Sequence, residues 1–477
     1  VYKRQVVVNV GNGITRDVAN ITIDPTHQLV MPSNTFLDVT GDIANEGQLV
    51  LDSTGPTTLL RAESSDLTFS GSGQLLLSGE GLNGLTALGN LLITNAASHT
   101  MEGAGNLGSN SSRFSNLGLI EANVAAGTLT LDPRNNGVGI GTFINSGVAQ
   151  ARNGGTLVIN GNGGGEFEGN GIYRAEAGSE VVLTTSAVVR DATFETVGDG
   201  VVRLADGQNI FFGDITNSGQ MRVGNNTDAG MFGTITNTGQ ITLASVNAQS
   251  DFELGSDVLL TGGGTLTLTG LDANVNSVGA FTLTNVNNTI QGNGDLGANG
   301  ARITNRGSIV SSQPGGILRI DPRNDGSGIA TFVNELGGEV RAEGTGTVVF
   351  TGSGGGEHLN HNGGRFVINS MAQLVTSATL RNEAGGRIEG DGTIEVLSGT
   401  FVNTGVVAPG QSVGTLTVDG TYNQGAGGSL EIEIDAGGND LLVATTANLD
   451  GTLDVLSSVN DPSNRGDVSE SVVIEAD

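Results

Sequence analysis

The chain has 477 residues, of which 79 are glycine, none is cysteine and 4% are aromatic, and its formal net charge is −29 at pH 7. The lack of cysteine excludes a disulfide-stapled module, the negative charge argues against a nucleic-acid binder, and the 8 prolines with no three-residue glycine period exclude collagen. Hydrophobic residues make up 36% of the chain, too many for a disordered protein, so we expect a long all-β chain.

The two ends of the sequence differ from the rest. Residues Val1–Gln5 do not follow the pattern of the remaining chain, and we set them aside as a fragment edge or a non-native scar. No charged segment followed by an apolar core marks a signal peptide, and no apolar run approaches the ~20 residues of a membrane helix. The sequence stops within a strand pattern at Val472–Asp477. We therefore expect any export signal or anchor to lie outside these residues.

A long internal repeat organises the chain. Asp132–Asn135 returns as Asp321–Asn324, and Gly103–Gly108 returns in similar form as Gly292–Gly297, both 189 residues later. This predicts two copies of a unit of about 190 residues. The predicted divisions are an N-terminal edge or cap at 1–33, repeat units at 34–222 and 226–405, terminal coils at 406–455, and a polar, truncated tail at 456–477.

A shorter motif, Asn-x-Gly followed by alternating apolar residues, recurs inside each unit. In the clearest example, which starts at Asn237, period-2 alternation places Ile241 and Leu243 on one face of a strand. Asn and Gly tolerate positive φ, so we expect the motif to bend the chain at a corner. The motif starts at Asn45, Asn116, Asn145, Asn217, Asn237, Asn305 and Asn403.

Strands and corners that alternate every 20–30 residues predict a β-solenoid, in which stacked coils bury an inward row of Val, Ile and Leu. At about 22 residues per coil, residues 34–455 would make roughly 19 coils. The alternative is a string of β-sandwich domains. It is less favoured because the sequence shows no 100-residue boundary and no Pro/Ser-rich linker.

The C-terminal part carries a resemblance to a known family. Ala408–Tyr422 is followed by Gly427–Asp435, Asn439–Val443 and Ala447–Val455, and these roughly 50 residues resemble the end of the passenger domain of bacterial autotransporter adhesins. The coils upstream resemble the wider autotransporter and filamentous-haemagglutinin class. This resemblance implies a right-handed parallel β-helix and a cell-surface location.

The resemblance leaves the anchoring mode open. The sequence contains no outer-membrane barrel, and its terminal pattern also resembles surface proteins that are sorted by a short C-terminal helix. The absence of cysteine agrees with the family, because such passengers cross the outer membrane unfolded.

Two histidines, His358 and His361, lie within Glu-His-Leu-Asn-His, and their spacing could present two imidazoles and a carboxylate to zinc. The matching positions in the first copy of the repeat are Phe167 and Asn170. A metal site built into the repeat would appear twice. We therefore expect exposed loop histidines and no metal site.

The paired residues Asp132 with Arg134, and Asp321 with Arg323, suggest lyase chemistry at first. Each pair brackets a proline and is followed by Asn, which favours a structural turn, and the presence of two copies favours architecture over one active site. Gly103–Gly108 matches a dinucleotide fingerprint, but it lacks a βαβ context, so we expect a solenoid corner.

Two further motifs occur once each. Gly437–Leu441 resembles part of a calcium-binding nonapeptide, but without a nine-residue period, so we expect only weak, non-specific calcium association with the acidic surface. Arg465–Asp467 spells the integrin-binding tripeptide, which this composition produces readily by chance. The sequence therefore predicts no catalytic residue, no cofactor and no specific metal ligand.

These observations favour a non-enzymatic, secreted or cell-surface β-helical adhesin or stalk that acts by many weak contacts. The expected partners are a host or neighbouring cell surface, through glycan or matrix, and an outer-membrane translocator or anchor outside this fragment. No nucleic acid is expected. The best recognition loops are Gly161–Gly171 and Gly352–Gly364. The alternatives are a β-helix enzyme acting on polysaccharide and a structural stalk without a ligand.

Overall fold

The computed structural model describes residues 5–7, 15–78, 82–135, 142–162, 165–325, 330–352, 357–435, 438–457 and 474–476. Over these residues the chain forms parallel strands that stack in a β-solenoid of about 18 turns, which confirms the all-β solenoid prediction. One short strand pair is antiparallel, between β50 (Ser429–Asp435) and β51 (Gly438–Asn439). None of the described residues forms a helix long and apolar enough to cross a membrane.

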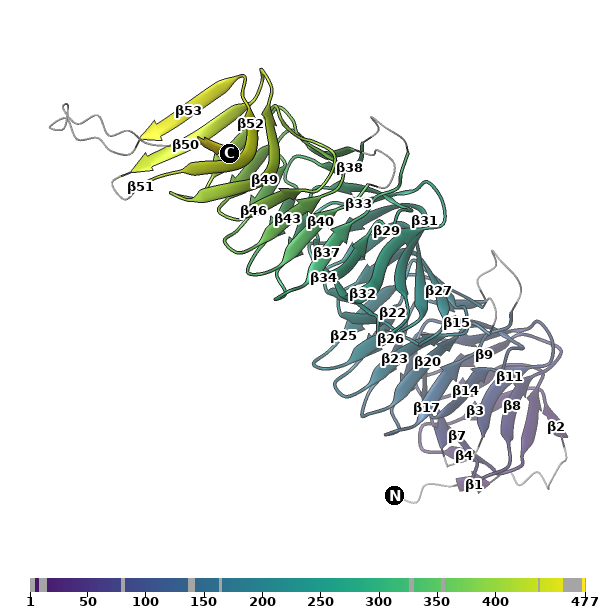
Figure 1. The fold of residues 1–477 in the computed structure, drawn as a ribbon. Coiled ribbons are helices and arrows are strands. Elements are labelled where there is room, and N and C mark those ends of the chain that lie inside the picture. Colours follow the sequence, from purple (N-terminus) through teal and green to yellow (C-terminus); the bar gives the residue numbers. More distant parts are fainter. Residues whose placement is uncertain are drawn as a thin grey trace, which may run out of the picture. The chain divides into compact units, whose positions relative to one another are not determined.

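The chain divides into two compact units. Unit 1 comprises Val1–Gly230 and Thr238–Ile241, and unit 2 comprises Met231–Asn237 and Thr242–Asp477. Within each unit most strands pair with the strand three places along the chain, so three strands make one turn and the turns build three parallel sheets (Figure 1).

In unit 1 the sheets are numbered in the order in which the chain visits them after an Asn-x-Gly corner. The first sheet contains β1 (Gln5–Val7), β4 (Gln28–Pro32), β7 (Gln48–Asp52), β10 (Gln74–Ser78), β13 (Thr100–Gly103), β16 (Leu119–Ala122), β19 (Val148–Ala151), β22 (Ile172–Ala175) and β25 (Thr193–Thr196). The second contains β2 (Thr15–Val18), β5 (Phe36–Val39), β8 (Thr58–Ala62), β11 (Asn83–Ala87), β14 (Gly105–Gly108), β17 (Thr128–Leu131), β20 (Thr156–Asn160), β23 (Glu180–Thr184), β26 (Val201–Leu204) and β28 (Gln220–Val223). The third contains β3 (Ile21–Ile23), β6 (Ile43–Asn45), β9 (Leu67–Ser70), β12 (Leu92–Asn95), β15 (Arg113–Asn116), β18 (Phe143–Asn145), β21 (Glu166–Glu168) and β24 (Val188–Arg190), and the longer β27 (Asn209–Asn217) pairs with both β24 and β25.

Unit 2 has the same three-sheet plan, entered through the long strands β31 (Ser250–Thr261), β32 (Thr265–Ser277) and β34 (Thr289–Leu296), each of which contributes to two sheets. The first sheet continues with β36 (Ser308–Ser311), β39 (Glu339–Ala342), β42 (Arg365–Ile368), β45 (Arg387–Gly390), β48 (Val406–Pro409), β50 and β53 (Thr452–Ser457). The second continues with β37 (Ile317–Ile320), β40 (Thr347–Phe350), β43 (Gln373–Thr376), β46 (Thr393–Val396), β49 (Thr415–Gln424), β52 (Leu441–Asn448) and β54 (Ile474–Ala476). The third contains β33 (Thr282–Asn285), β35 (Arg302–Asn305), β38 (Ala330–Asn334), β41 (Glu357–Asn360), β44 (Thr379–Asn382) and β47 (Phe401–Asn403), followed by the second half of β49.

The core is a narrow column of inward side chains that stack on their counterparts in the next turn. In the first sheet of unit 1, Leu49, Leu75 and Met101 lie in register and are fully buried. In the third sheet, the rings of Phe114 and Phe143 stack with centroids 5.3 Å apart. Because each inward side chain is covered by the turns on either side, the apolar area removed from water grows with every added turn.

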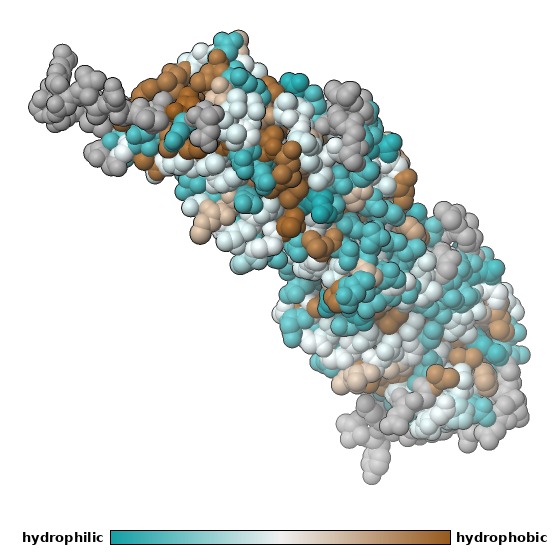
Figure 2. Space-filling view, viewed as in Figure 1, coloured by the Kyte–Doolittle hydropathy of each residue, from teal (hydrophilic) through white to brown (hydrophobic). Residues whose placement is uncertain are grey.

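At the C-terminal side of unit 2 this cover is incomplete. Leu453 and Val455 of β53 lie in register with the buried Leu430 and Ile432 of β50, but they are 49% and 50% exposed. Figure 2 shows apolar side chains gathered on the surface at this end.

A ladder of buried asparagines runs through the interior of each unit. In unit 1, Asn95 Nδ2 donates to Asn116 Oδ1, and Asn116 Nδ2 donates to Asn145 Oδ1, both at 2.8 Å. The amide of Asn116 also donates to the backbone carbonyl of Val148 at 3.2 Å. Each of these asparagines is the last residue of a third-sheet strand and is fully buried. A primary amide suits this position because it donates to one neighbour and accepts from the other.

The ladder is longer in unit 2. It ends at Tyr422, whose hydroxyl accepts from Asn403 Nδ2 at 3.0 Å and donates to Gln424 Oε1 at 2.7 Å. The Nδ2–Oδ1 distances between successive ladder residues are 2.8–2.9 Å, and those residues are Asn285, Asn305, Asn334, Asn360, Asn382 and Asn403.

In both units one turn of the ladder has no asparagine at the end of its third-sheet strand. A side chain from the next turn, three or four residues after the ladder asparagine of that turn, bridges the gap. In unit 1, His99 Nε2 lies 3.1 Å from Asn45 Nδ2, and its Nδ1 lies 2.8 Å from Asn95 Oδ1. In unit 2 the bridge is Asn288, whose Oδ1 accepts from Asn237 Nδ2 at 3.0 Å. His99 and Asn288 are 189 residues apart, which is the offset of the sequence repeat.

The expected role of the Asn-x-Gly motif as a positive-φ bend is wrong. None of the seven motif asparagines, and none of the glycines two residues after them, has φ in the left-handed region. The asparagine is needed for its buried amide. The glycine is needed because the corners stack closely: a Cβ on Gly147 would lie 2.2 Å from the carbonyl oxygen of Gly118.

We expect Asn334→Ala to lower the free energy of unfolding by about 1–3 kcal/mol, because Asn305 Nδ2 loses its side-chain acceptor and the buried Asn360 Oδ1 loses its donor. Asn334→Asp should cost more, because a buried carboxylate accepts but cannot donate to Asn360 Oδ1. Urea-induced unfolding followed by circular dichroism measures both. The exposed Asn362→Ala is the matched control from the next corner and should change stability by less than about 0.5 kcal/mol. Equal effects of the Asn334 and Asn362 substitutions would refute the ladder's role.

Candidate functional site

The outward face of the first sheet in unit 2 carries arginine and glutamate side chains on successive turns. Glu339, Arg365 and Arg387 lie in register on β39, β42 and β45. Arg341 of β39 and Glu389 of β45 lie one outward position further along their strands. This register places the Arg365 guanidinium within reach of a carboxylate on each of the two adjacent turns.

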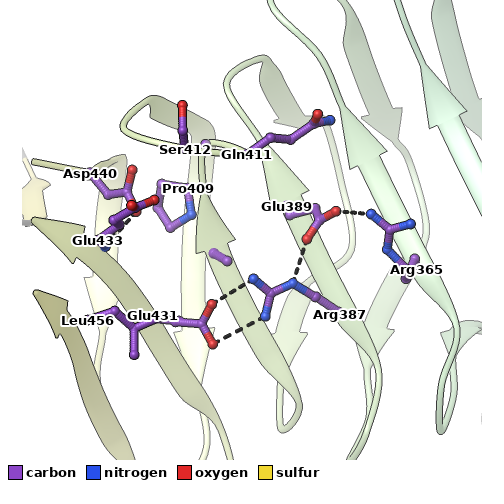
Figure 3. A pocket seen from close by; sticks show the side chains of 12 residues that line it. Arg365, Arg387, Glu389, Pro409, Gln411, Ser412, Glu431, Glu433, Asp440 and Leu456 are labelled. Atoms are coloured by element: carbon purple, nitrogen blue, oxygen red, sulfur yellow. Dashed lines mark hydrogen bonds and ion pairs between the residues drawn. The ribbon is translucent and has the colours of Figure 1, made fainter. Parts of the chain in front are cut away.

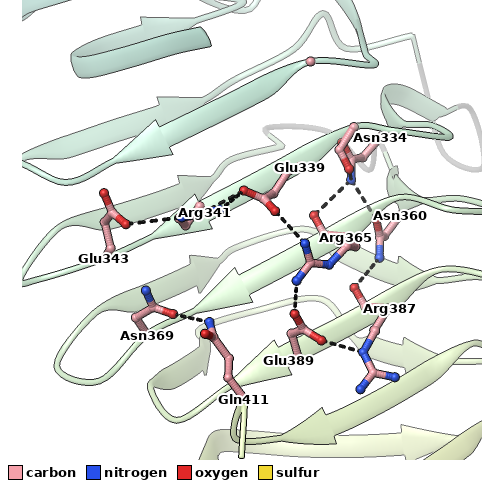
Figure 4. Close-up of polar contacts among 12 residues, drawn as sticks. Asn334, Glu339, Arg341, Glu343, Asn360, Arg365, Asn369, Arg387, Glu389 and Gln411 are labelled. Atoms are coloured by element: carbon pink, nitrogen blue, oxygen red, sulfur yellow. Dashed lines mark hydrogen bonds and ion pairs between the residues drawn. The ribbon is translucent and has the colours of Figure 1, made fainter. Parts of the chain in front are cut away.

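These side chains form a continuous ionic ladder (Figure 4). Glu339 accepts from Arg341 Nε and from Arg365 Nη1, both at 2.9 Å. Arg365 Nη2 also donates to Glu389, which in turn accepts from Arg387 Nε at 2.5 Å. In order, the ionic ladder comprises Glu343, Arg341, Glu339, Arg365, Glu389, Arg387 and Glu431.

Its last contact spans a whole turn. Arg387 Nη2 and Nη1 donate to the two carboxylate oxygens of Glu431 on β50, at 2.7 and 3.3 Å, although β48 lies between β45 and β50 in the sheet (Figure 3). The outward residue of β48 beside Glu389 is Ala408, which is small enough for the guanidinium to pass over it. The bidentate pair therefore cross-links two turns that do not touch through their own strands.

The electrostatics of the ionic ladder favour its charged form. Burial acts to raise the pKa of Glu389, but hydrogen bonds and charges from Arg387 and Arg365 outweigh it and hold the pKa below its usual range. The Arg387 pKa is raised, because its hydrogen bonds to Glu431 and Glu389 outweigh burial. Both groups are therefore ionised throughout the physiological pH range.

A polar pocket of about 290 Å³ lies beside Arg387, with Gln411 and Ser412 on its rim (Figure 3). Its inner wall includes Asp440, whose carboxylate accepts the backbone N–H groups of Gly414 at 2.8 Å and Glu433 at 2.7 Å. Burial and the nearby Glu433 and Glu431 raise the pKa of Asp440, although these two hydrogen bonds act against the change. Through these two hydrogen bonds Asp440 links the corner at Gly414 to β50.

The two histidines of the candidate zinc motif lie in different environments. His358 is fully buried, with Nε2 3.0 Å from the carbonyl oxygen of Thr351 and its ring 4.9 Å from that of Phe350. His361 is 52% exposed, and its Nδ1 lies 2.8 Å from Glu383. The prediction of two exposed loop histidines is therefore wrong for His358, because its position on β41 is inward.

The sequence contained a signal for this burial. His358 lies in register with the core residues Phe332 and Leu380, and the first copy of the repeat has the buried Phe167 at the same position. Alternation along β41 therefore marks His358 as an inward residue.

The two Asp-Pro-Arg-Asn segments follow the same backbone course. Arg134 N donates to Ser112 O, and Arg323 N donates to Ala301 O, both at 2.8 Å. Asp132 is buried, which raises the pKa of its carboxylate, and it accepts from Asn106 at 3.4 Å.

The remaining sequence candidates are placed as follows. Gly103–Gly108 contains a corner between β13 and β14, with φ of 117° at Gly103 and 154° at Gly105. Within the segment Gly437–Leu441, Gly437 lies outside the described residues, as does the whole of Arg465–Asp467. So do 163–164 and 353–356 in the two expected recognition loops.

Comparisons with known proteins do not assign a family to the chain. No protein-family model matches it, and no curated protein matches it.

We expect Arg387→Met to destabilise the protein by about 1–2 kcal/mol, because the buried Glu389 and the partly exposed Glu431 lose the cation that they share. The guanidinium is 34% exposed, so solvent screening keeps the effect at this modest size. Thermal unfolding measures it. The difference should shrink in 1 M NaCl. Because the pKa of Glu389 is lowered on folding, the contribution should be present above the usual carboxylate pKa and disappear as pH falls below it.

The control for this prediction is Arg306→Met. Arg306 is 50% exposed and pairs only with Glu335 among the described ion pairs, so we expect a change below about 0.5 kcal/mol. An effect as large as that of Arg387→Met would mean that the ionic ladder adds nothing beyond isolated pairs.

Acid should weaken the protein through its two buried histidines. Burial lowers the pKa of His99 to about 4 and that of His358 to about 4, although a hydrogen bond to Thr351 opposes the change at His358. The folded pKa lies below the unfolded value of about 6.5. Stability is therefore complete above about pH 6.5 and falls as pH approaches 4, by up to about 3 kcal/mol per histidine.

Unfolding in urea across pH 4–8 tests this expectation. His99→Asn copies the bridge that Asn288 provides in unit 2, so it should keep neutral-pH stability close to that of the parent while reducing the acid loss. Asn362→Ala, a change at an exposed position that does not titrate, should leave the pH profile unchanged. An unaltered acid loss in His99→Asn would contradict the role of His99.

Proposed function

We propose that this protein is a non-enzymatic β-helical adhesin or stalk, displayed on a bacterial surface, that acts by many weak contacts. The observation that carries the proposal is the polar cross-linking of successive turns. Inside, the asparagine ladder joins turn to turn with hydrogen bonds of 2.8–2.9 Å. Outside, the ionic ladder joins the turns of unit 2, including two that are not adjacent.

Cross-links of this kind suit a protein under tension. In a parallel solenoid each turn is held to the next by backbone hydrogen bonds and core contacts alone. A force that separates turns must also break the hydrogen bonds between the buried side-chain amides. Water cannot replace the partners of these amides in the core. Such reinforcement supports a mechanical role, because an adhesin transmits load from its ligand to its anchor.

The surface chemistry supports contact with other surfaces. The net charge of −29 keeps copies apart in solution, and the outward positions of the strands carry many hydroxyl, amide and carboxylate groups. A long, regular polar surface offers many equivalent weak contacts, which together give avidity. Glycan or matrix on a host or neighbouring cell is the partner that this chemistry favours.

Location rests on the sequence. The resemblance of Ala408–Val455 to the end of autotransporter passengers and the absence of cysteine support secretion to the cell surface. An outer-membrane translocator or anchor is a further partner that this location requires.

The test uses beads coated with the purified chain at graded densities and presented to bacterial cells and epithelial monolayers. We expect attachment that rises steeply with coating density, as multivalent contact requires. Beads coated with urea-unfolded chain are the control. Absence of attachment at every density, with the fold verified by circular dichroism, would leave the ligand-free stalk. Release of reducing ends from polysaccharides incubated with the chain would instead establish the enzyme alternative.

A further inference from the structure

A groove on the second sheet of unit 1 arises from an unusually tight corner. Between β13 and β14 the chain turns with the single residue Ala104, flanked by Gly103 and Gly105. A Cβ on Gly103 would lie 2.0 Å from the carbonyl oxygen of Leu77, and one on Gly105 would lie 2.5 Å from that of Asn83. Only glycine allows this corner to lie flush against the turn before it.

Exposed apolar side chains lie on either side of this corner. On one side Leu82, just before β11, is 69% exposed. On the other, the loop Val124–Gly127 precedes β17, with Val124 41% exposed and Ala126 in the left-handed region at φ 58°. These residues and the flush corner line a groove of about 630 Å³, a size typical of small-molecule sites.

The floor of the groove is the outward face of four neighbouring strands. Leu59, Gly84, Asn106 and Thr130 lie in register on β8, β11, β14 and β17. Gly84 keeps the floor low, because a Cβ there would lie 2.7 Å from the Cδ2 atom of Leu59. Asn106 is fixed in place: its Oδ1 accepts from the backbone N–H of Ser109 at 2.7 Å and from the Ser109 hydroxyl at 3.1 Å.

The chemistry of the groove is neutral and amphipathic. Aliphatic groups come from Leu59, Leu82 and Val124, and hydroxyl groups come from Thr57, Thr128 and Thr130. None of the described residues that line the groove is charged, although the chain as a whole carries −29.

The second copy of the repeat has mostly charged side chains at the positions that form the floor of the groove in unit 1. In register on the corresponding strands of unit 2 lie Asp251, Asn274, Asp295 and Arg319. Asn274 Nδ2 donates to Asp251 Oδ1 at 2.9 Å, and Arg319 Nη1 donates to Asp295 at 3.3 Å. Unit 2 thus uses these positions to bind side chains to one another. An open, uncharged strip is therefore no general consequence of the repeat.

We propose that this groove binds a short segment of a neutral glycan. A sugar ring has apolar C–H faces and a rim of hydroxyl groups, which match the aliphatic walls and the threonine hydroxyls. The charge of −29 repels sulfated or sialylated chains, and the lining offers no cation to hold them. A peptide could not add as a strand here, because the floor is a sheet face whose backbone groups are paired with the adjacent turns. The inference deepens the proposed adhesive function and rests on it.

The test begins with the full chain on an array that holds neutral oligosaccharides of glucose, galactose, mannose and N-acetylhexosamines beside sulfated and sialylated ones. The best neutral hit is then titrated by calorimetry. Gly84→Leu fills the groove without adding charge and should weaken binding at least tenfold. Thr130→Arg introduces the residue that unit 2 has at this position and should do the same. Thr68→Arg, on the third sheet of the same unit, adds the same charge elsewhere and should leave binding within twofold of the parent.

Circular dichroism and thermal unfolding establish that each variant is folded, and Thr130→Arg carries the test if Gly84→Leu does not fold. Equal binding by the parent and both groove variants would overturn the site. Binding confined to anionic glycans, or to peptides, would overturn the ligand class. If coated beads attach to cells but no neutral glycan binds, the adhesive function stands and this inference falls. If neither occurs, both fall.

Discussion

The stacking of turns at the spacing of paired strands is the constraint on which the rest of this structure depends. It brings each inward residue into contact with its counterparts above and below, so a polar residue is tolerated inside only if its polar atoms find hydrogen-bond partners there. Asparagine meets this condition, because its amide donates to one neighbour and accepts from the other, as Asn305, Asn334 and Asn360 do in succession. The same close stacking demands glycine at the corner, where the carbonyl oxygen of the previous turn leaves no room for a Cβ at Gly147.

Because the interior is fixed in this way, variation is confined to the outward faces and to the corners. On unit 2 the outward positions of the first sheet form the ionic ladder, which lets Arg387 reach Glu431 across an intervening strand. On unit 1 a groove lies at the one-residue corner at Ala104. The proposed adhesive role uses both kinds of feature: the cross-links resist separation of the turns, and the corners supply specific contact.

The two copies of the repeat show how far one frame can be adapted. His99 and Asn288 bridge the same gap in the ladder, but only the histidine responds to acid. Phe167 and His358 occupy the same core position, at which the histidine packs against Phe350 and also places its Nε2 3.0 Å from the carbonyl oxygen of Thr351. Such exchanges are permitted because each inward side chain contacts only its own turn and the turns on either side of it.

The sequence by itself determined the all-β solenoid, since period-2 alternation and recurring corners need no knowledge of distant contacts. It located the Asn-x-Gly corners, but it did not show that their asparagines form a buried ladder. The partner of Asn116 is Asn145, 29 residues away, and only the stacking of turns brings the two together. It also missed the ladder asparagines that are not part of an Asn-x-Gly motif, such as Asn95, Asn360 and Asn382. The tertiary structure alone decided how closely the corner at Ala104 lies against the turn before it and which side chains line the groove beside it. Those properties depend on which residues of separate turns lie in register, and register is set by packing between turns rather than within any one of them.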